Sequence, residues 1–463
     1  INLAISRANE AFATYSALPA AKRAEFLRAI GEEIVNLGDE LVTVATAETG
    51  LPAARIQGER GRTVGQLGLF ADLLEKGEYQ GVIDLADPER QPLPKPETRL
   101  GYLPLGVVGV FAASNFPLAF STAGGDTASA LASGCPVVMK AHAAHPGTAE
   151  LVAQAIAKAI DICGLDKGVF SLIQGKNYAI SSQIVTHPLV KAVGFTGSER
   201  VGMILQRQIN EREEPIPFYG ELGSVNPQFI MPNKIATEGA ALGEGLVASL
   251  MMGMGQFCTS PGIWAVVEDE NYSDFVNAAV NSITEQAPGV MLTPGIASSY
   301  NNAVKEWQSI PGVEHLASGK SGESHQCTAA LFSTDLKTFI ANKQLHEEVF
   351  GSCALILRCA DMSEMMQFIT LLKGNLTASI HATDSDIELS KQVARAVCHK
   401  VGRLIYNQMP TGVEVCASMN HGGPFPASTD LRTTSVGSEA IKRFQRPICY
   451  QNMPNILLPE LLK

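Results

Sequence analysis

A regular alternation of short apolar runs and longer amphipathic stretches, between about residues 106 and 197, constrains the fold most strongly. The apolar runs read GVVGVFAAS, CPVVMKA, GVFSLIQG and KAVGFTG, and the stretches between them carry apolar residues at helical spacing. Runs that are apolar throughout indicate strands buried on both faces, and their separation by helices is typical of a parallel sheet. We therefore predict an α/β protein with a parallel sheet of the dinucleotide-binding type, although no GxGxxG follows the first strand.

The composition argues against several classes of function. The formal net charge is -11 and the pI is near 5.4, so the chain lacks the basic surface that nucleic-acid binding requires. No stretch reaches the roughly 18 uninterrupted apolar residues of a membrane span. Nine cysteines without a CxxC pair predict neither a disulfide framework nor a metal site, and they favour a reducing, cytoplasmic compartment.

The sequence GMGQFCTSPG, residues 253–262, places a cysteine in a glycine-rich break after an apolar run. Glycine and the Pro-Gly pair favour a loop, so Cys258 is expected to project from a turn, as a nucleophile does. The alternative for an isolated cysteine is a small buried core residue. The neighbours of Cys258 alone leave both interpretations open.

A second glycine-rich turn, GFTGSERVG at residues 194–202, leads from a predicted strand directly into a predicted helix. Gly197 permits the turn. Ser198 is expected to cap the helix and to leave the first backbone N–H groups available to a phosphate. The alternative is an ordinary strand-to-helix turn that binds no ligand.

Four widely separated motifs together resemble the aldehyde dehydrogenase superfamily. In chain order they are FAASNFPLAF around Asn115, CPVVMKAHAAHPGT around Lys140, GFTGSERVG with FYGELGSVNP around Glu221, and GQFCTSPG with LHEEVFG. Each motif is weak alone, whereas the ordered set covers nearly the whole chain. The resemblance implies NAD(P)-dependent oxidation of an aldehyde to a carboxylate.

The resemblance also implies roles for the catalytic residues. Cys258 is the nucleophile, and the side-chain amide of Asn115, with the Cys258 backbone N–H, stabilises the oxyanion. Glu221 is the general base, and its apolar neighbours are expected to give it a pKa suited to proton abstraction from water. His421 is expected to assist proton movement near the thiol. Without the family, Asn115 reads as a turn residue, Glu221 as a paired carboxylate, and His421 as a hydrogen-bonded loop histidine.

The cofactor residues follow from the same motifs. Lys140 is implied to bind the adenosine ribose and Glu348 the nicotinamide ribose, with Phe350 beside the ring or, alternatively, in the core. Ala143 stands where NAD-preferring relatives commonly carry a glutamate, which favours NADP over NAD. The predicted cofactor site is completed by His142, Phe195, Gly197, Ser198, Gly202 and Leu222.

The substrate prediction rests on a narrower resemblance. FYGELGSVNP, KAHAAHPGT, PTGVEV and HGGPFPAST resemble the alpha-ketoglutaric semialdehyde dehydrogenases and also the luminous-bacterial NADP-dependent fatty aldehyde dehydrogenase. The favoured reaction is 2,5-dioxopentanoate to 2-oxoglutarate. The alternatives are oxidation of medium- or long-chain aldehydes, acyl transfer to coenzyme A, and a catalytically silent nucleotide-binding structural protein. Arg62, one turn from Gln66, is a hypothetical binding residue for the substrate carboxylate, and the alternative is an exposed helix arginine. Phe116 is predicted as a further substrate residue.

The length of 463 residues and the changes in pattern predict three parts. An NAD(P)-binding domain is expected to comprise residues 1–78 and 105–221, and a catalytic domain residues 222–434. Residues 79–104 and 435–463 are expected to form an oligomerisation arm and tail, because prolines crowd the first segment and the tail shows no strand partner in its own domain. A homodimer or homotetramer is expected.

Overall fold

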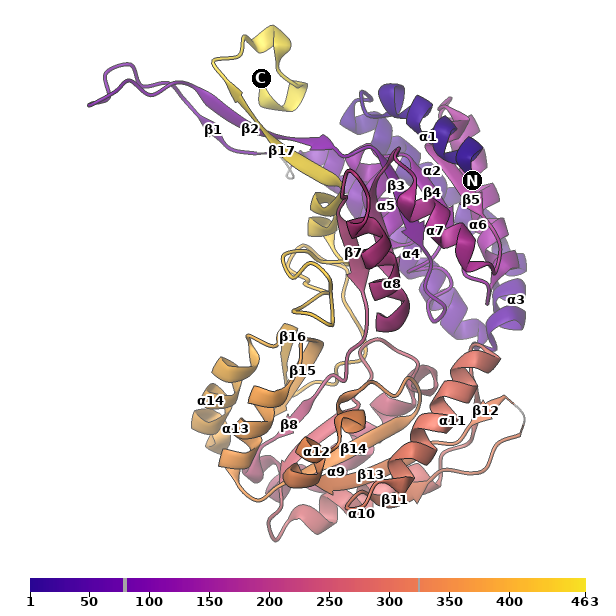
Figure 1. Ribbon diagram of the computed structural model, residues 1–463, viewed down its shortest axis with the longest axis vertical. Helices are drawn as coiled ribbons and strands as arrows, with labels where there is room; N and C mark the ends of the chain where they lie inside the picture. Colours follow the sequence, from indigo (N-terminus) through magenta and orange to yellow (C-terminus); the bar gives the residue numbers. More distant parts are fainter. Residues whose placement is uncertain (78–80, 324) are drawn as a thin grey trace.

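The computed structural model describes residues 1–77, 81–323 and 325–463. It has two lobes, each built on its own sheet, and a thin sheet that projects from the first lobe (Figure 1). The N-terminus lies in the first lobe and the C-terminus beside the projecting sheet (Figure 1). The predicted domain boundary at residue 78 falls outside the described residues.

The first lobe contains a five-stranded parallel sheet in the order β5-β4-β3-β6-β7. Its strands are β3 (Val107–Phe111), β4 (Val137–Lys140), β5 (Phe170–Ile173), β6 (Val190–Thr196) and β7 (Phe218–Glu221). The surrounding helices are α1 (Asn2–Tyr15), α2 (Ala20–Asn36), α3 (Gly38–Thr49), α4 (Ala53–Lys76), α5 (Gly125–Ser133), α6 (Pro146–Ile162), α7 (Tyr178–Thr186) and α8 (Glu199–Asn210). The parallel sheet predicted from the apolar runs is confirmed.

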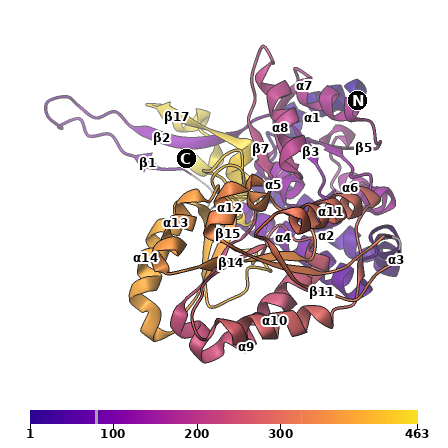
Figure 2. The same cartoon turned by 60° about the horizontal axis from the view of Figure 1, so that its bottom comes forward.

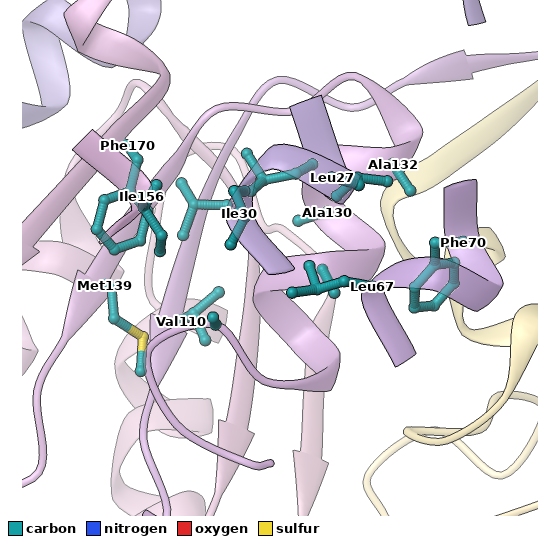
Figure 3. Close-up of a cluster of buried hydrophobic side chains, with 14 of the residues drawn as sticks. Leu27, Ile30, Leu67, Phe70, Val110, Ala130, Ala132, Met139, Ile156 and Phe170 are labelled. Carbon is teal, nitrogen blue, oxygen red and sulfur yellow. The ribbon is translucent and has the colours of Figure 1, made fainter. Parts of the chain in front are cut away.

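Both faces of this sheet are covered, which explains why its strands are apolar throughout. On one face Val110 and Met139 pack against Leu27 and Ile30 of α2 and Leu67 of α4 (Figure 3). The other face packs against α1, α7 and α8 through a second cluster whose members include Ile5, Val107, Phe111, Ile184 and Leu205. Successive side chains of β3 therefore enter opposite cores.

The second lobe contains a seven-stranded sheet in the order β11-β13-β14-β9-β8-β15-β16, in which only the edge strand β11 is antiparallel. Its strands are β8 (Gln228–Ile230), β9 (Ile263–Val267), β11 (Glu314–Ser318), β13 (Ala330–Asp335), β14 (Cys353–Cys359), β15 (Asn375–His381) and β16 (Val401–Tyr406). Its helices are α9 (Pro232–Met251), α10 (Tyr272–Thr284), α11 (Pro294–Ser309), α12 (Leu336–Ala341), α13 (Met362–Leu371) and α14 (Ile387–Val397). A short ribbon of β10 (Gly289–Val290) and β12 (Gln326–Cys327) lies beside it.

The projecting sheet consists of β1 (Ile83–Asp84), β2 (Thr98–Pro104) and β17 (Gln445–Gln451), all antiparallel. Strand β17 pairs with β2 along its whole length, so the tail does have a strand partner within its own chain. The sequence did not reveal this pairing because more than 300 residues separate the two strands. The sheet extends clear of both lobes (Figure 2). The segments next to its strands expose large apolar side chains at Val82, Leu85, Leu93, Ile456 and Leu457.

Within the described residues, none of the helices combines the length and the apolar character that crossing a membrane demands.

Candidate active site

A cleft with a volume of about 550 Å³ opens at the carboxyl ends of β3 and β6. Strand order reverses between these two strands, because β4 and β5 lie to one side of β3 while β6 and β7 lie to the other. Such a switch point is where doubly wound sheets bind ligands. Cys258, Glu221 and Asn115 all line the cleft, together with residues of both lobes.

The loop that carries Cys258 lies between α9 and β9 and is held in an unusual backbone conformation. Gly253, Met254 and Gly255 all have a positive φ, which only glycine adopts easily. A Cβ on Gly255 would lie 2.2 Å from the carbonyl of Gly351, so glycine is required there for space as well. The side-chain amide of Asn226 donates to the carbonyl oxygens of Cys258 and Ser260, each at 2.9 Å. Cys258 is therefore a half-buried residue on a fixed loop, as the nucleophile hypothesis requires.

Three functional groups converge at the nucleophile. His421 Nε2 lies 3.5 Å from the Cys258 Sγ and 3.0 Å from Glu221 Oε1. Glu221 ends β7 and is 3% exposed, and His421 is 2% exposed. Because a single ring nitrogen makes both contacts, His421 Nε2 can accept a proton from the thiol, and the neighbouring Glu221 carboxylate stabilises the positive charge that results.

Glu221 is ionised at neutral pH. Burial raises its pKa, but the facing His421 and the Ser435 hydroxyl outweigh this and hold the pKa below its usual value. The groups that lower it come from residues 200 and 214 positions away along the chain, which the apolar sequence neighbours of Glu221 do not reveal. The Ser435 Oγ donates to Glu221 Oε2 at 2.6 Å. Sequence reasoning missed Ser435, which carries no recognisable motif.

The Asn115 side chain contacts the loop that carries Cys258. Its Nδ2 donates to the carbonyl oxygen of Gln256 at 2.8 Å, which leaves a second N–H on the same nitrogen. The buried carboxylate of Glu59 fixes the segment after Asn115 by accepting from the backbone N–H groups of Leu118 and Ala119, both at 2.9 Å. Glu59 also pairs with Arg55 at 2.6 Å. Sequence reasoning missed both of these α4 residues.

Phe116, predicted to contact substrate, lies in an aromatic cluster beside the nucleophile. Its ring centroid is 5.2 Å from those of Phe120 and Phe257. The Arg55 guanidinium lies over the Phe116 ring, 4.5 Å from its centroid. The cluster therefore forms a wall next to Cys258.

The cofactor residues predicted from the sequence come together along the cleft, with one exception. Those that line it are Lys140, His142, Ala143, Phe195, Gly197, Ser198, Leu222, Glu348 and Phe350. Gly202 does not line the cleft. A Cβ at this position would lie 2.3 Å from the Leu222 side chain, so Gly202 allows α8 to pack closely against Leu222 and Phe195.

Ser198 occupies the N-cap position of α8, but its side chain makes no capping hydrogen bond. The prediction is therefore right that Ser198 is the N-cap residue and wrong that its side chain makes a capping hydrogen bond. The first turn of α8 and the Ser198 hydroxyl both remain available at the cleft wall, where a phosphate can accept from them. The β6–α8 turn thus fits a dinucleotide without a GxGxxG sequence.

Two titratable groups along the cleft have strongly shifted pKa values. Burial, with the nearby His145 and Lys140 charges, lowers the pKa of His142 to about 3, so this ring is neutral at physiological pH. Desolvation of the Glu348 carboxyl raises its pKa to about 8, and the Glu221 charge contributes to this shift. Lys140 and Lys176 are the cleft-lining lysines among the described residues.

The Cys258 thiol is protonated at neutral pH in the free protein. Burial raises its pKa well above 9, and the charges of Glu221 and Glu348 add to the shift. Below that pKa the thiolate fraction rises tenfold for each pH unit. We therefore expect the rate of Cys258 alkylation by iodoacetamide to increase about tenfold per unit between pH 7 and 9. Peptide mass spectrometry would measure the rate, and a plateau near pH 7 would contradict the raised pKa.

Arg62 is not among the residues that line the cofactor cleft, and it is not the exposed helix arginine of the alternative interpretation. Its Nη1 donates to the carbonyl oxygen of Val413, and its buried Nε and Nη2 have no partner in the described part of the chain. Its guanidinium carbon is 5.9 Å from the Phe120 ring centroid, and that ring is 6.1 Å from His421. Gln66 is buried beside Gly125.

Arg403 on β16 resembles Arg62 in its surroundings, and no sequence motif indicated it. It donates to the carbonyl oxygens of Gly412 and Pro410 at 2.8 and 2.7 Å, and its buried Nε has no partner among the described residues. Burial lowers the pKa of both Arg62 and Arg403, while the negative charge of a Cys258 thiolate raises it, so both groups lie within electrostatic range of the nucleophile. The two arginines thus both hold the 410–413 loop by donating hydrogen bonds to its backbone carbonyl oxygens.

Comparison with known proteins decides the family. Residues 1–444 match the aldehyde dehydrogenase family. The chain belongs to the aldehyde dehydrogenase family. It is 48% identical over 465 residues to alpha-ketoglutaric semialdehyde dehydrogenase 2 of Azospirillum brasilense, covering all of this chain and 89% of that protein. It is 44% identical over 466 residues to the alpha-ketoglutaric semialdehyde dehydrogenase of Acinetobacter baylyi, covering all of this chain and 88% of that protein.

The fold also matches that of a solved aldehyde dehydrogenase structure. The crystal structure of gamma-glutamyl-gamma-aminobutyraldehyde dehydrogenase from Burkholderia cenocepacia superposes with a TM-score of 0.82 at 20% identity, covering 97% of this chain and 88% of that one. The predicted aldehyde dehydrogenase fold is confirmed. As a family member, this chain is an aldehyde-oxidising enzyme that uses NAD(P), and the cleft at the β3–β6 switch point has the volume and the helix N-terminus that a dinucleotide needs.

Proposed function

We propose that this aldehyde dehydrogenase oxidises 2,5-dioxopentanoate to 2-oxoglutarate. The observation that carries this proposal is the pair of arginines, Arg62 and Arg403, whose unpartnered buried donors lie within electrostatic range of Cys258. A buried N–H donor without an acceptor is costly, and a substrate carboxylate would relieve that cost. The two relatives that cover the full chain, both named alpha-ketoglutaric semialdehyde dehydrogenases, support the same substrate.

Catalysis begins at Cys258. The sulfur adds to the aldehyde carbon while its proton passes to His421 Nε2, 3.5 Å away. The carbonyl oxygen becomes an oxyanion, which accepts from the second N–H of the Asn115 amide and from the Cys258 backbone N–H. When bound in the cleft, a nicotinamide dinucleotide supplies the two-electron acceptor that side chains lack. Loss of hydride from the former aldehyde carbon then leaves a thioester on Cys258.

Glu221 completes the cycle as general base. Its carboxylate takes a proton from a water molecule as the water oxygen attacks the thioester carbon, and the sulfur leaves and regains a proton. Ser435 holds the other carboxylate oxygen at 2.6 Å and so keeps the base aimed at the nucleophile. Hydrolysis, rather than acyl transfer to coenzyme A, is favoured because this base is present.

NADP is the proposed coenzyme, with NAD as the alternative. Ala143 lines the cleft and adds no negative charge, so a 2'-phosphate meets no repulsion from this position. His142 is neutral and supplies no compensating charge, which leaves Lys140 and Lys176 as the cationic groups available to the phosphate.

Steady-state kinetics test the substrate and the coenzyme together. The rates of NADP and NAD reduction are measured with 2,5-dioxopentanoate and with decanal, and kcat/KM values are compared. We expect the ketoacid to have the higher kcat/KM with either coenzyme, and NADP to exceed NAD. A higher value for decanal would replace this proposal with the fatty-aldehyde activity.

The arginine pair gives a sharper prediction. We expect Arg62→Ala and Arg403→Ala each to raise KM for 2,5-dioxopentanoate by about 10- to 100-fold, because each removes a charged hydrogen-bond donor to the carboxylate. Their kinetics with pentanal, an aldehyde of the same length without a carboxylate, should stay within about twofold of wild type. Arg60→Ala is the matched control, because Arg60 lies on the same helix and also donates to a backbone carbonyl, that of Gly38. An equal loss with both aldehydes would show that the arginines only support the 410–413 loop.

We also propose that the three larger sheets mark three domains with the predicted division. The arm, in this proposal, mediates assembly into a homodimer or homotetramer. The exposed apolar residues on the arm, including Val82, Leu93 and Ile456, support this assembly. Sedimentation velocity measures the assembled mass.

A further inference from the structure

The Cys258, His421 and Glu221 cluster has a second chemical capacity besides catalysis. The thiol sulfur, one imidazole nitrogen and one carboxylate oxygen lie within 4.8 Å of one another. Sulfur, nitrogen and oxygen donors of these types are the ligands that zinc uses in proteins, and three protein ligands with one open position are typical of accessible zinc sites.

The separations of the donor atoms match a tetrahedral ion. The Cys258 Sγ lies 3.5 Å from His421 Nε2, and that nitrogen lies 3.0 Å from Glu221 Oε1. Zinc bonds are about 2.3 Å to sulfur and 2.0 Å to nitrogen and oxygen. With bonds of these lengths, both separations correspond to ligand–metal–ligand angles near or slightly below the tetrahedral value. Two of the three donor separations therefore suit a zinc-sized ion as they stand, and the third, between Sγ and the carboxylate oxygen, is no more than 4.8 Å.

The charges also balance. A thiolate and a carboxylate together neutralise a divalent cation, and the imidazole coordinates through its neutral form with the proton on Nδ1. The Ser435 hydroxyl holds the second carboxylate oxygen at 2.6 Å and so orients this ligand, as outer hydrogen bonds do in metal sites. Both Glu221 and His421 are almost completely buried, so their ligand atoms are already fixed in place.

We propose that Cys258, His421 and Glu221 form an inhibitory site for a thiophilic divalent cation such as zinc. On binding, the thiol proton is released to solvent, and the sulfur, Nε2 and a carboxylate oxygen each form a bond to the metal. The nucleophile and the base are then both occupied, so the enzyme is switched off without oxidation of the cysteine. Magnesium is excluded, because it prefers oxygen ligands and the site offers one carboxylate.

Protection of Cys258 from alkylation tests this proposal directly in the wild-type protein and does not depend on its substrate. Iodoacetamide labelling is followed by peptide mass spectrometry with zinc chloride, with magnesium chloride, and with zinc followed by a chelator. We expect zinc to slow labelling of Cys258 by at least about tenfold, reversibly, and magnesium to have no effect. The exposed Cys398 serves as internal control and should label at the same rate throughout. Equal labelling of Cys258 with and without zinc would overturn the proposal.

Variants distinguish the three-ligand site from simple capture of zinc by a thiol. We expect His421→Ala to raise the zinc concentration needed for half-protection by at least about tenfold. The reason is that removing a ligand weakens metal binding more than removing a residue that only hydrogen-bonds to a ligand. Glu221→Gln provides the same test if the first variant is not folded by circular dichroism. With cobalt as probe, the absorption band of a cobalt–thiolate bond should form in wild type and be absent in Cys258→Ser. Unchanged half-protection in both ligand variants would contradict the site.

Discussion

Replacing Cys258 by serine should lower kcat for aldehyde oxidation by at least about 10³-fold, because the covalent route is lost and a serine hydroxyl is a far weaker nucleophile at neutral pH. The fold should be unaffected, since serine is close to cysteine in size and the loop is held by the Asn226 contacts to backbone carbonyls. The measurement is steady-state coenzyme reduction at saturating substrate, with circular dichroism and thermal denaturation to check the fold.

Cys398→Ser is the matched control, because that thiol is exposed and donates to the carbonyl oxygen of Arg395 on the same helix turn. It should retain full activity. Retention of more than about a tenth of kcat in Cys258→Ser would exclude a thioester mechanism at this residue. It would also revive the alternative of a nucleotide-binding protein whose role does not depend on the cysteine.

Glu221→Gln should separate the two halves of the reaction. Glutamine keeps the size of the side chain and a polar contact with His421 and Ser435, but it cannot accept a proton from water at neutral pH. We expect one equivalent of reduced coenzyme per active site in a rapid burst, followed by turnover about 10²- to 10⁴-fold slower than wild type. Stopped-flow absorbance of the reduced nicotinamide measures both phases.

Ser435→Ala provides the comparison for this second prediction. Loss of the 2.6 Å hydrogen bond to Glu221 Oε2 should misorient the base without removing it, so the steady-state loss should be smaller and a burst should still precede it. A loss of the burst itself in Glu221→Gln would mean that Glu221 acts before hydride transfer, as the acceptor of the thiol proton through His421.

Much of the fold was predictable, because the local pattern and the tertiary environment agree. Strands such as β3 are apolar throughout since both of their faces are buried, and the sequence shows this directly. Strand order and the pairing of β2 with β17 were not predictable, since both depend on contacts between segments that are distant in sequence, more than 300 residues apart for β2 and β17. The antiparallel edge strand β11 likewise carries no local signal of its direction.

Apart from Arg62, which was proposed from its position on a helix, the site residues were predicted where a family motif marks them. Cys258, Glu221 and Asn115 each lie in such a motif, and the structure places all three along one cleft. Arg403 and Ser435 lie in segments without one, and their roles follow from contacts formed only in the folded chain. The capping hydrogen bond expected at Ser198 does not form, and the space around Gly202 is limited by Leu222 and Phe195, which come from other parts of the chain.

Mass spectrometry of the trapped intermediate tests the central claim most directly. Glu221→Gln is mixed with 2,5-dioxopentanoate and NADP, quenched in acid after the burst, and digested. The peptide containing Cys258 should carry an acyl group of the mass of the oxidised substrate, and hydroxylamine should remove it, as it does a thioester. Coenzyme reduction without an adduct on Cys258, or with the adduct on another cysteine, would contradict the mechanism.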